Sequence, residues 1–338
     1  MSVRTLLVTG GCGFIGSNFT RFWLERHPDD RVIVLDKLTY AGRPENLHDL
    51  LHHPRLTLLV GDILDHDVVL QTCGDQDVSL IVHFAAETHV DQSIHTPLAF
   101  TRTNALGTHV LLEVARQLGC HFHYASTDEV YGQVLDGQPR VECDALDPRS
   151  PYSASKAAGE HLVKASVVTY GLRATITRGS NTVGPYQHVE KAVPLFSTNA
   201  LLSEPLPVYG DGLQMRDYLH VLDHCAGVAA VLEAGAPGET YNLGAGSEIT
   251  NMRMAQVILE TLGRPFSLIR HVRDRPGHDR RYSMNVSKLR ALGWQPRHTA
   301  EESIAATARW YAQNSWWWEP LRDGEFRSYY ERQYGPSA

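Results

Sequence analysis

The chain has 338 residues, a formal net charge of -7, 43% hydrophobic residues and 20% charged residues, a composition typical of a globular protein with a large core. The negative charge disfavours nucleic acid and anionic membranes as partners, although a local basic pocket could still bind a phosphorylated ligand. There is no apolar run of membrane-spanning length and no signal peptide pattern, so we expect no membrane partner and a cytoplasmic location.

The cysteines support the same location. Their number is odd and no two are spaced as CxxC, which indicates free thiols in a reducing compartment and no metal site. They are Cys12, Cys73, Cys120, Cys143 and Cys225.

Short apolar segments of β type alternate with helical patterns through the first half of the chain. They are residues 6–8, 32–35, 56–60, 80–82 and 122–124. Strands that alternate with helices predict βαβ units, and therefore a Rossmann-type doubly wound parallel sheet in an α/β protein.

The alternation ends near residue 180, where prolines and glycines separate shorter elements. We therefore expect a Rossmann domain over 1–180 and a smaller C-terminal α/β substrate lobe over 181–216 and 245–338. A segment over about 217–244 returns to the first domain, because 239–243 reads as a further strand of the main sheet.

A glycine-rich turn follows the first predicted strand. Gly10, Gly13 and Gly16 have the spacing of a dinucleotide-binding loop, and a helix is expected from about Ile15 to Arg26. Such a loop lets the backbone approach a pyrophosphate at the helix N-terminus, whereas the alternative is an ordinary glycine-rich turn. The strand before it and the helix after it favour dinucleotide binding.

Two carboxylates follow the next strands. Asp36 ends the second strand about 20 residues after the loop, where a carboxylate accepts both ribose hydroxyls and repels a 2′-phosphate, so NAD is favoured over NADP. Lys37 beside it weakens that preference. Asp62 could accept from the adenine amine or belong to an ordinary strand-end turn.

Tyr152 and Lys156 lie four residues apart in a helix expected from Pro151 to about Tyr170. This spacing places both on one face, where the lysine ammonium would lower the tyrosine pKa and make it a general base toward a sugar hydroxyl. The alternative is an amphipathic helix that carries both residues by chance.

An adjacent acid pair, Asp128 and Glu129, follows Thr127 at the end of a buried strand. Open α/β sheets have their active sites at the carboxyl ends of the strands, so these residues are candidates for catalysis. The motif also fits a helix start in which a hydroxyl caps a first turn that carries acids. The motif alone does not separate the two interpretations.

Taken together, the motifs resemble those of the nucleotide-sugar 4,6-dehydratases of the extended short-chain dehydrogenase/reductase family, and most closely the branch that acts on dTDP-glucose. The resemblance covers nearly the whole chain. STDEVYG is its most specific motif, because related epimerases and decarboxylases usually lack the Asp-Glu pair. The matching segments are TGGCGFIGSN at 9–18, LDKLTYAG at 35–42, HFAAETHVD at 83–91, STDEVYG at 126–132, SPYSASKA at 150–157, VGPYQ at 183–187, LPVYGDG at 206–212, MRDYLHVLDH at 215–224, YNLG at 241–244, DRPGHDRRY at 274–282, LGW at 292–294 and WYAQNSWW at 310–317.

The resemblance implies an internal redox cycle on a nucleotide-hexose. Tyr152 takes the 4-OH proton while C4 gives hydride to NAD. Glu129 then removes the C5 proton, Asp128 protonates the departing 6-OH, and hydride returns to C6. Opposite roles for adjacent acids require separated pKa values. Thr127 hydrogen-bonds the oxygen on C4, and Lys156 also contacts the nicotinamide ribose.

The resemblance also implies binding residues. Thr88 matches a residue near both nicotinamide and sugar, and Arg216 suits a pyrophosphate, although it could instead form a surface ion pair. The cofactor contacts implied are Gly10, Gly13, Phe14, Ile15, Gly16, Asp36, Lys37, Thr39, Asp62, Ile63, Phe84, Ala85, Ala86, Thr88, Thr103, Tyr152 and Lys156. The substrate contacts implied are Glu87, Thr88, Thr127, Asn181, Glu190, Lys191, Pro207, Tyr209, Arg216, Asn251, Arg275 and His278.

Several positions depart from the family pattern. Asn-Thr-Val at 181–183 replaces the usual Asn-Asn-Tyr, and His-Val at 188–189 replaces Phe-Pro. Gln92 and Tyr218 stand where Arg and Trp are usual. These changes leave the catalytic set intact, but they keep a UDP-hexose or another C4 configuration open.

Three functions remain as alternatives to the dTDP-glucose reaction. They are a UDP-hexose 4,6-dehydratase, a nucleotide-sugar 4-epimerase or decarboxylase, and a non-catalytic NAD-binding regulator. An epimerase has no need of Asp128 and Glu129. A protein that only binds NAD does not require these two acids together with Tyr152 and Lys156. The family resemblance further implies a homodimer paired through helices that include the one after Tyr152, and a packing role for Trp316, Trp317 and Trp318.

Overall fold

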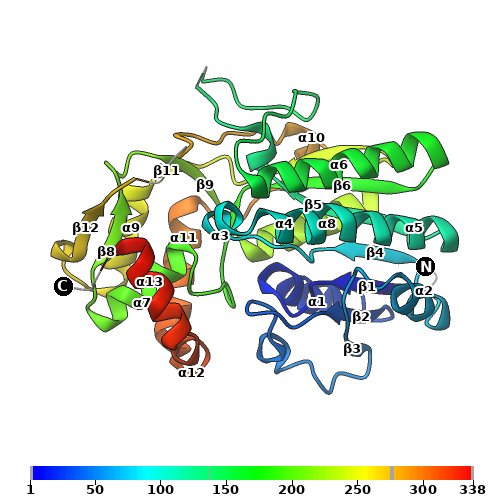
Figure 1. Cartoon of the computed structure of the whole chain (residues 1–338), viewed down its shortest axis with the longest axis horizontal. Helices are drawn as coiled ribbons and strands as arrows, with labels where there is room; N and C mark the ends of the chain where they lie inside the picture. The colour runs from blue at the N-terminus through cyan, green and yellow to red at the C-terminus, as the bar shows by residue number, and fades with distance from the viewer. Residues whose placement is uncertain (1–2, 136, 275–277, 336–338) are drawn as a thin grey trace.

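The computed structural model describes residues 3–135, 137–274 and 278–335. Within them, a seven-stranded parallel sheet has the order β10-β6-β5-β4-β1-β2-β3 (Figure 1). The predicted doubly wound α/β fold is confirmed, and so is the return of the segment at 239–243 to this sheet. The strands are β1 (Thr5–Thr9), β2 (Arg31–Asp36), β3 (Leu56–Val60), β4 (Leu80–His83), β5 (His121–Thr127), β6 (Ala174–Gly179) and β10 (Thr240–Leu243).

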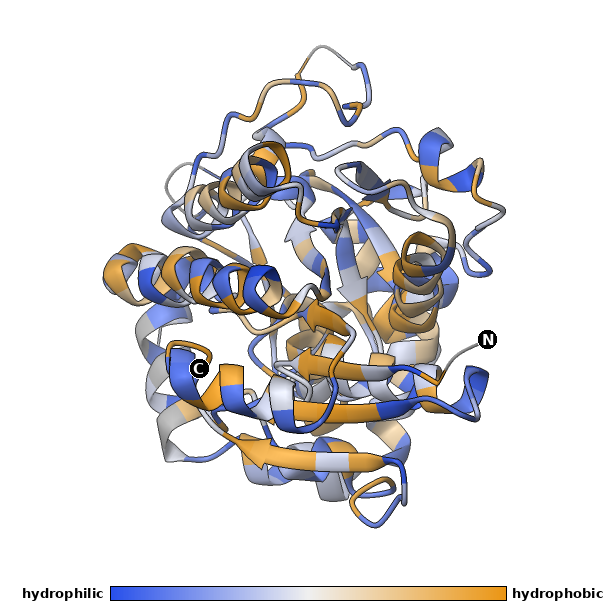
Figure 2. Cartoon of the chain, turned by 90° about the vertical axis from the view of Figure 1, so that its right-hand side faces the viewer, coloured by the Kyte–Doolittle hydropathy of each residue, from blue (hydrophilic) through white to orange (hydrophobic). Residues whose placement is uncertain are grey.

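Apolar residues of the central strands contact helices on both faces of the sheet. In β1, Leu6 and Val8 pack toward α1 (Phe14–Arg26) and α8 (Val221–Ala234). Leu7 points to the opposite face, because successive strand residues alternate sides. That face is covered by α2 (His66–Asp75), α5 (Thr108–Leu118) and α6 (Pro151–Tyr170). Figure 2 shows the hydrophobic strands between the two helical layers.

A second hydrophobic core lies in the lobe at the left of Figure 1. Two small sheets, β11-β9-β7 and β12-β8, pack there with helices α7 (Ala192–Leu202), α9 (Asn251–Leu262) and α11 (Ala300–Gln313). Their strands are β7 (Asn181–Val183), β8 (Leu206–Tyr209), β9 (Met215–His220), β11 (Glu248–Thr250) and β12 (Ile269–Val272).

The remaining helical elements complete the described part of the chain. They are η1 (Pro44–Leu47), α3 (Val90–His95), α4 (Pro97–Phe100), the π-helical η2 (Thr101–Gly107), η3 (Asp128–Tyr131), η4 (Phe266–Leu268), α10 (Ser287–Arg290), α12 (Ser315–Trp318), η5 (Glu319–Leu321) and α13 (Gly324–Tyr334).

The start of α6 is specified locally by its sequence. Ser150 caps the helix by accepting from the Ser153 backbone N–H at 3.1 Å, and the Ser153 hydroxyl accepts from the Ser150 N–H at 3.0 Å. This reciprocal pair is a capping box, and Pro151 at the first helical position fits its restricted φ. Tyr152 therefore lies in a fixed first turn.

Among residues 3–135, 137–274 and 278–335, no helix has the combination of length and apolar character that crossing a bilayer requires.

Candidate active site

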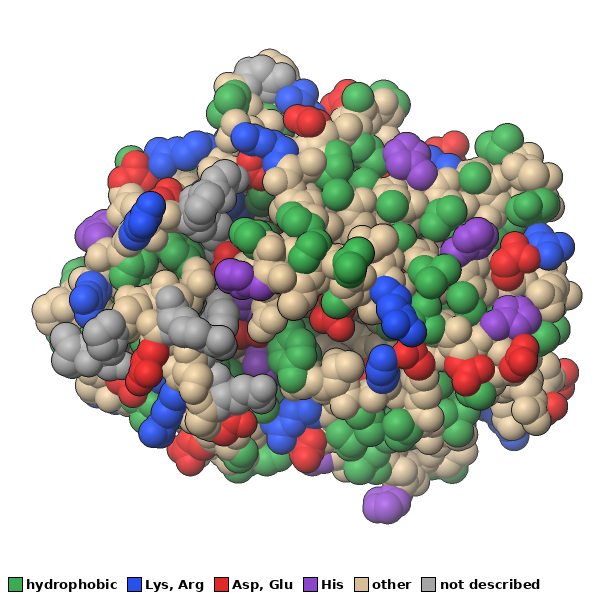
Figure 3. All heavy atoms as spheres, in the orientation of Figure 1, with side chains coloured by type: hydrophobic (Ala, Val, Ile, Leu, Met, Phe, Trp, Pro, Cys, Tyr) green, Lys and Arg blue, Asp and Glu red, His purple; other side chains and the backbone are tan. Residues whose placement is uncertain are grey.

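A cavity of about 560 Å³ lies at the carboxyl ends of the large sheet and is also lined by the second lobe. Figure 3 shows a hollow near the middle of this face of the molecule. Every residue proposed above for catalysis, cofactor or substrate lines the cavity, except Arg275, which lies outside the described residues. The fold therefore brings together segments that lie far apart in the sequence.

The glycine loop is packed too closely for larger residues. Gly10 has a φ of 68°, and a Cβ there would lie 2.6 Å from the backbone of Ala85. A Cβ on Gly16 would lie 2.3 Å from the Gly10 carbonyl oxygen. Helix α1 begins after Gly13 without a side-chain cap, so its first N–H groups suit a phosphate. These features fit a dinucleotide pyrophosphate.

Asp36 lies at the end of β2 on the cavity wall. Its carboxylate accepts from the backbone N–H groups of Cys12 and Leu38, each at 2.9 Å. Burial raises its pKa, and these two hydrogen bonds oppose the shift. Lys37 points instead to Asp62, with an Nζ–Oδ2 distance of 2.6 Å, so its charge is paired across the predicted adenine region.

The acid pair starts the short helix η3. Thr127 is the last residue of β5, and its hydroxyl accepts from the Glu129 N–H at 3.3 Å while it donates to Asp128 Oδ1 at 3.2 Å. The capping interpretation is thus correct. Asp128 and Glu129 also line the cavity, so a role in catalysis stays a prediction that their position allows. Burial, reinforced by the neighbouring Glu129, raises the pKa of Asp128 to about 8.

Tyr152 and Lys156 also line the cavity, from the first two turns of α6. The predicted lowering of the Tyr152 pKa is wrong for the protein alone. Burial and the nearby Glu129 raise the pKa of Tyr152 well above its usual range, against an opposing hydrogen bond with Thr127. The Lys156 ammonium donates to the Ala125 carbonyl oxygen at 2.6 Å, and burial lowers its own pKa to about 7.

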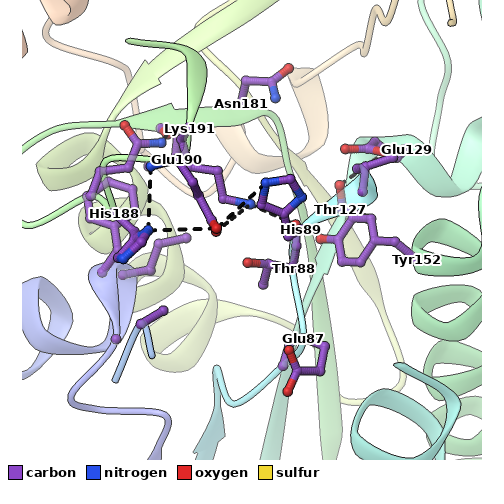
Figure 4. Close-up of a pocket in the computed structure, with 18 of the residues that line it drawn as sticks. Glu87, Thr88, His89, Thr127, Glu129, Tyr152, Asn181, His188, Glu190 and Lys191 are labelled. Atoms are coloured by element: carbon purple, nitrogen blue, oxygen red, sulfur yellow. Dashed lines mark hydrogen bonds and ion pairs between the residues drawn. The ribbon is translucent and has the colours of Figure 1, made fainter. Parts of the chain in front are cut away.

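On the opposite side of the cavity a buried carboxylate, Glu190, is surrounded by polar side chains (Figure 4). Tyr40 donates to its Oε1 at 3.0 Å, and His89 Nε2 lies 3.6 Å from its Oε2. His188 and Lys191 approach the same carboxylate at 3.8 Å. Burial raises the pKa of Glu190 and lowers that of His188 to about 4. No group of three or more His, Cys, Asp or Glu side chains in the described residues could bind a metal ion.

The predicted pyrophosphate residue Arg216 is buried and does not form the surface ion pair considered above. Its guanidinium donates to the carbonyl oxygens of Met215 at 2.7 Å and Asp279 at 2.9 Å. It also stacks on the ring of Tyr282, with Cζ 4.4 Å from the ring centroid. His278 lies nearby, with Nδ1 2.6 Å from Asp274 Oδ1.

Some cavity residues were not predicted from the sequence. His89, Asp279 and Tyr282 lie inside quoted motifs and could have been selected there, because each is a polar residue in a motif that also supplies predicted contacts. His224 ends the quoted motif at 215–224, which also supplies Arg216, and could have been selected in the same way. The Nδ1 atom of His224 lies 2.8 Å from the hydroxyl of Thr182. Thr182, which departs from the family pattern, therefore has a hydrogen-bond partner in the cavity wall.

Comparisons with known proteins agree with this geometry. The family model described as GDP-mannose 4,6 dehydratase matches residues 7–307. A dTDP-glucose 4,6-dehydratase of Streptomyces niveus is 46% identical over 324 residues, which cover 94% of this chain and 95% of that protein. A dTDP-glucose 4,6-dehydratase of Mycobacterium tuberculosis is 45% identical over 331 residues, which cover 97% of this chain and 99% of that protein.

A solved structure is similar in fold as well as in sequence. The dTDP-glucose 4,6-dehydratase DesIV of Streptomyces venezuelae, crystallised with NAD, superposes with a TM-score of 0.90 at 47% identity. The match covers 94% of this chain and 99% of that chain. The chain therefore belongs to the GDP-mannose 4,6 dehydratase family.

Proposed function

We propose that the protein is an NAD-dependent nucleotide-hexose 4,6-dehydratase that converts dTDP-glucose to dTDP-4-keto-6-deoxyglucose. One observation carries the proposal: Asp128 and Glu129 line the cavity together with Tyr152 and Lys156. A 4-epimerase or a binding protein has no use for an acid pair beside the tyrosine. The relatives named above, at 45% and 46% identity, favour dTDP-glucose among nucleotide sugars.

The cofactor fits the glycine loop, the start of α1 and Asp36. Bound NAD supplies the hydride acceptor at C4, the hydride donor at C6 and a positively charged ring that favours the Tyr152 phenolate. Asp36 accepts from the adenosine ribose hydroxyls, and Asp62 with Lys37 borders the adenine.

The acid–base steps are assigned to Tyr152, Glu129 and Asp128. Tyr152 accepts the proton of the hexose 4-OH, and Thr127 hydrogen-bonds the same oxygen. Glu129 removes the C5 proton, which the C4 ketone has made acidic. Asp128 keeps its proton at neutral pH because its pKa is about 8, so it can protonate the departing 6-OH and release water.

The second lobe provides the substrate side of the proposal. We assign the Rossmann domain to 1–180 with a returning segment over about 217–244, and nucleotide-sugar binding to 181–216 and 245–338. Arg216 suits the pyrophosphate because a guanidinium binds phosphate oxygens in pairs. Glu190 and Lys191 border the hexose, and Pro207, Tyr209, Asn251 and His278 border the nucleotide.

We also propose a homodimer. An apolar groove on the outer face of α4, η2 and α6 is lined by Leu98, Ala105, Leu106 and Leu162. Leu98 is 82% exposed and Leu106 is 52% exposed, and grouped apolar exposure of this kind typically marks a protein interface. The free state of all five cysteines supports a reducing, cytoplasmic location.

One experiment tests the proposed function. Purified protein is incubated with dTDP- and UDP-linked glucose and galactose, and the alkaline ultraviolet chromophore of a 4-keto-6-deoxy sugar is followed. We expect product from dTDP-glucose. Product from UDP-hexoses alone would reassign the nucleotide, and interconversion of glucose and galactose without the chromophore would make the protein an epimerase.

A further inference from the structure

An aromatic cluster outside the cavity connects the C-terminal segment to the body of the protein. It consists of Tyr186, Trp310 and Trp317, whose ring centroids lie 5.0 to 5.7 Å apart in edge-on contacts. Trp317 lies in α12, at the lower tip of the left lobe in Figure 1, and is 2% exposed. Its ring therefore has a packing role, as expected from the sequence, but its indole N–H has a separate partner.

The indole N–H of Trp317 begins a chain of buried hydrogen bonds. It donates to Asn46 Oδ1 at 2.8 Å, across 271 positions of sequence. Asn46 lies in η1 and is 1% exposed. Its Nδ2 donates at 2.8 Å to the carbonyl oxygen of Cys12, which is part of the glycine loop. The next link is the Cys12 N–H, which donates to Asp36 Oδ2 at 2.9 Å.

The direction of these bonds gives Trp317 control over the orientation of Asn46. A side-chain amide has one accepting and one donating end, and the indole can only donate. The Trp317 N–H therefore fixes Oδ1 toward α12 and Nδ2 toward Cys12. Without that donor, the amide can rotate and lose its bond to the glycine loop.

We propose that Trp317 is a positioning residue for the dinucleotide, and that it couples the C-terminal segment to cofactor affinity through Asn46, Cys12 and Asp36. The inference rests on the proposed NAD-binding function, because Asp36 and the glycine loop that contains Cys12 belong to the proposed cofactor site. Trp317 itself does not line the cavity. Coupling between two sites is reciprocal, so NAD should also stabilise α12.

The test compares Trp317→Phe with Trp318→Phe in the full-length protein. Trp318 is 3% exposed and donates its indole N–H to the Tyr311 carbonyl oxygen at 2.8 Å, within the C-terminal lobe. Both variants lose one buried indole hydrogen bond and the same volume, but only Trp317 reaches the glycine loop. We expect Trp317→Phe to bind NAD roughly tenfold more weakly than wild type, which is the effect of about one unsatisfied hydrogen bond. The NAD affinity of Trp318→Phe should be nearly unchanged.

Two further measurements separate a relay from general destabilisation. Asn46→Leu should weaken NAD binding by a similar factor, and the double variant with Trp317→Phe should be no weaker than Asn46→Leu alone, because both changes interrupt one path. In the wild-type protein, NAD should slow backbone hydrogen exchange in residues 315–318. This exchange measurement needs no variant and stands even if Trp317→Phe folds poorly.

The outcomes are distinct. Equal NAD affinity in wild type and Trp317→Phe, equal weakening by the two tryptophan variants, or additive effects of Asn46→Leu and Trp317→Phe would each overturn the relay while leaving the proposed function intact. Wild-type protein that binds no NAD would contradict the proposed function and the relay together.

Discussion

Arg178 and Glu160 form an ion pair at 2.6 Å, and both side chains are 0% exposed. Arg178 lies on β6, and Glu160 lies on α6, one turn after Lys156. The Arg178 guanidinium also donates to the Tyr131 hydroxyl at 2.5 Å, and this hydroxyl donates to Asn242 Oδ1 at 2.8 Å. The ion pair therefore connects the tyrosine–lysine helix to the end of η3, the turn that carries the acid pair.

Tyr131→Phe should slow the elimination of water more than the oxidation at C4. The variant keeps the ring but removes the hydroxyl between Arg178 and Asn242, which frees the end of η3 while Glu160 still fixes α6. We expect roughly a tenfold loss in kcat, since a hydrogen bond to a charged group contributes about 1.5–3 kcal/mol. The measurement is the near-ultraviolet absorbance of reduced nicotinamide during turnover, which should rise above the wild-type level.

A matched control for this variant is Tyr241→Phe. Tyr241 is 3% exposed on β10, and its hydroxyl accepts from the Ala236 N–H at 2.9 Å, away from η3. If both variants lower kcat equally without extra reduced nicotinamide, Tyr131 contributes to stability alone.

Asp128→Asn should become progressively more stable than wild type as the pH rises. The pKa of Asp128 is raised from 3.8 to about 8 in the folded protein, so between these values the unfolded chain loses a proton that the folded chain retains. The free energy of unfolding of wild type therefore falls relative to that of the variant between about pH 4 and about pH 8. Above about pH 8 the difference between the two proteins stays constant. Denaturant unfolding at a series of pH values measures the difference.

The exposed carboxylate Asp211 provides the comparison. Its pKa is lowered by hydrogen bonding from Arg280, so it is ionised in both states above pH 5. Asp211→Asn should thus show a constant stability difference from wild type over pH 5–9. A flat profile for Asp128→Asn as well would mean that Asp128 is ionised in the folded protein and cannot be the proposed acid.

The fold and most of the cavity could be predicted because their signals are local. Apolar strand runs, the glycine spacing and the spacing of Tyr152 to Lys156 each act within a short stretch of sequence. Asp36 could be placed by counting from the loop. The resemblance supplied the substrate side, where contacts come from scattered short segments.

The remaining features depend on contacts that no pattern encodes. The pKa of Tyr152 was predicted from its spacing to Lys156, but burial and Glu129 determine its direction. The bond from Trp317 to Asn46 joins opposite ends of the chain, and a tryptophan in an aromatic motif gives no sign of where its N–H points.

The purified protein should carry NAD without its addition, and NADP should bind on the order of a hundredfold more weakly. A cofactor that is regenerated in each cycle need not leave, and the Asp36 carboxylate would face a 2′-phosphate at close range in a partly buried site. Absorbance of the nucleotide released on denaturation, with titrations of both cofactors, provides the measurement. Equal affinities would show that the Asp36 carboxylate does not discriminate against the 2′-phosphate.

The wild-type protein should be a dimer at micromolar concentration, and Leu98→Glu with Leu106→Glu should make it monomeric. Two charges in the apolar groove would be buried without partners in the interface, which is strongly unfavourable. Light scattering gives the mass. Leu213→Glu, at another leucine that is 53% exposed, should remain dimeric. A monomeric wild-type protein would contradict the proposed dimer.

Replacing both acids should separate the two half-reactions. In the proposed mechanism, oxidation at C4 needs Tyr152 and Lys156 from α6, whereas water loss needs Asp128 and Glu129 from η3. In the double variant Asp128→Asn, Glu129→Gln, the amides keep the shape of the turn, and the Thr127 cap of η3 remains. We expect reduced nicotinamide and the 4-keto hexose to accumulate on the enzyme while deoxy product falls about a hundred- to ten-thousand-fold.

Tyr152→Phe provides the opposite result, because loss of the proton acceptor should block oxidation and leave the nicotinamide oxidised. The two variants thus differ in a spectroscopic signal and not only in rate. A general loss of folding would remove the signal from both, so retention of bound NAD is checked first in each. If the double variant forms deoxy product at the wild-type rate, Asp128 and Glu129 serve only to start η3, and the proton transfers at C5 and C6 must be assigned to other residues of the cavity.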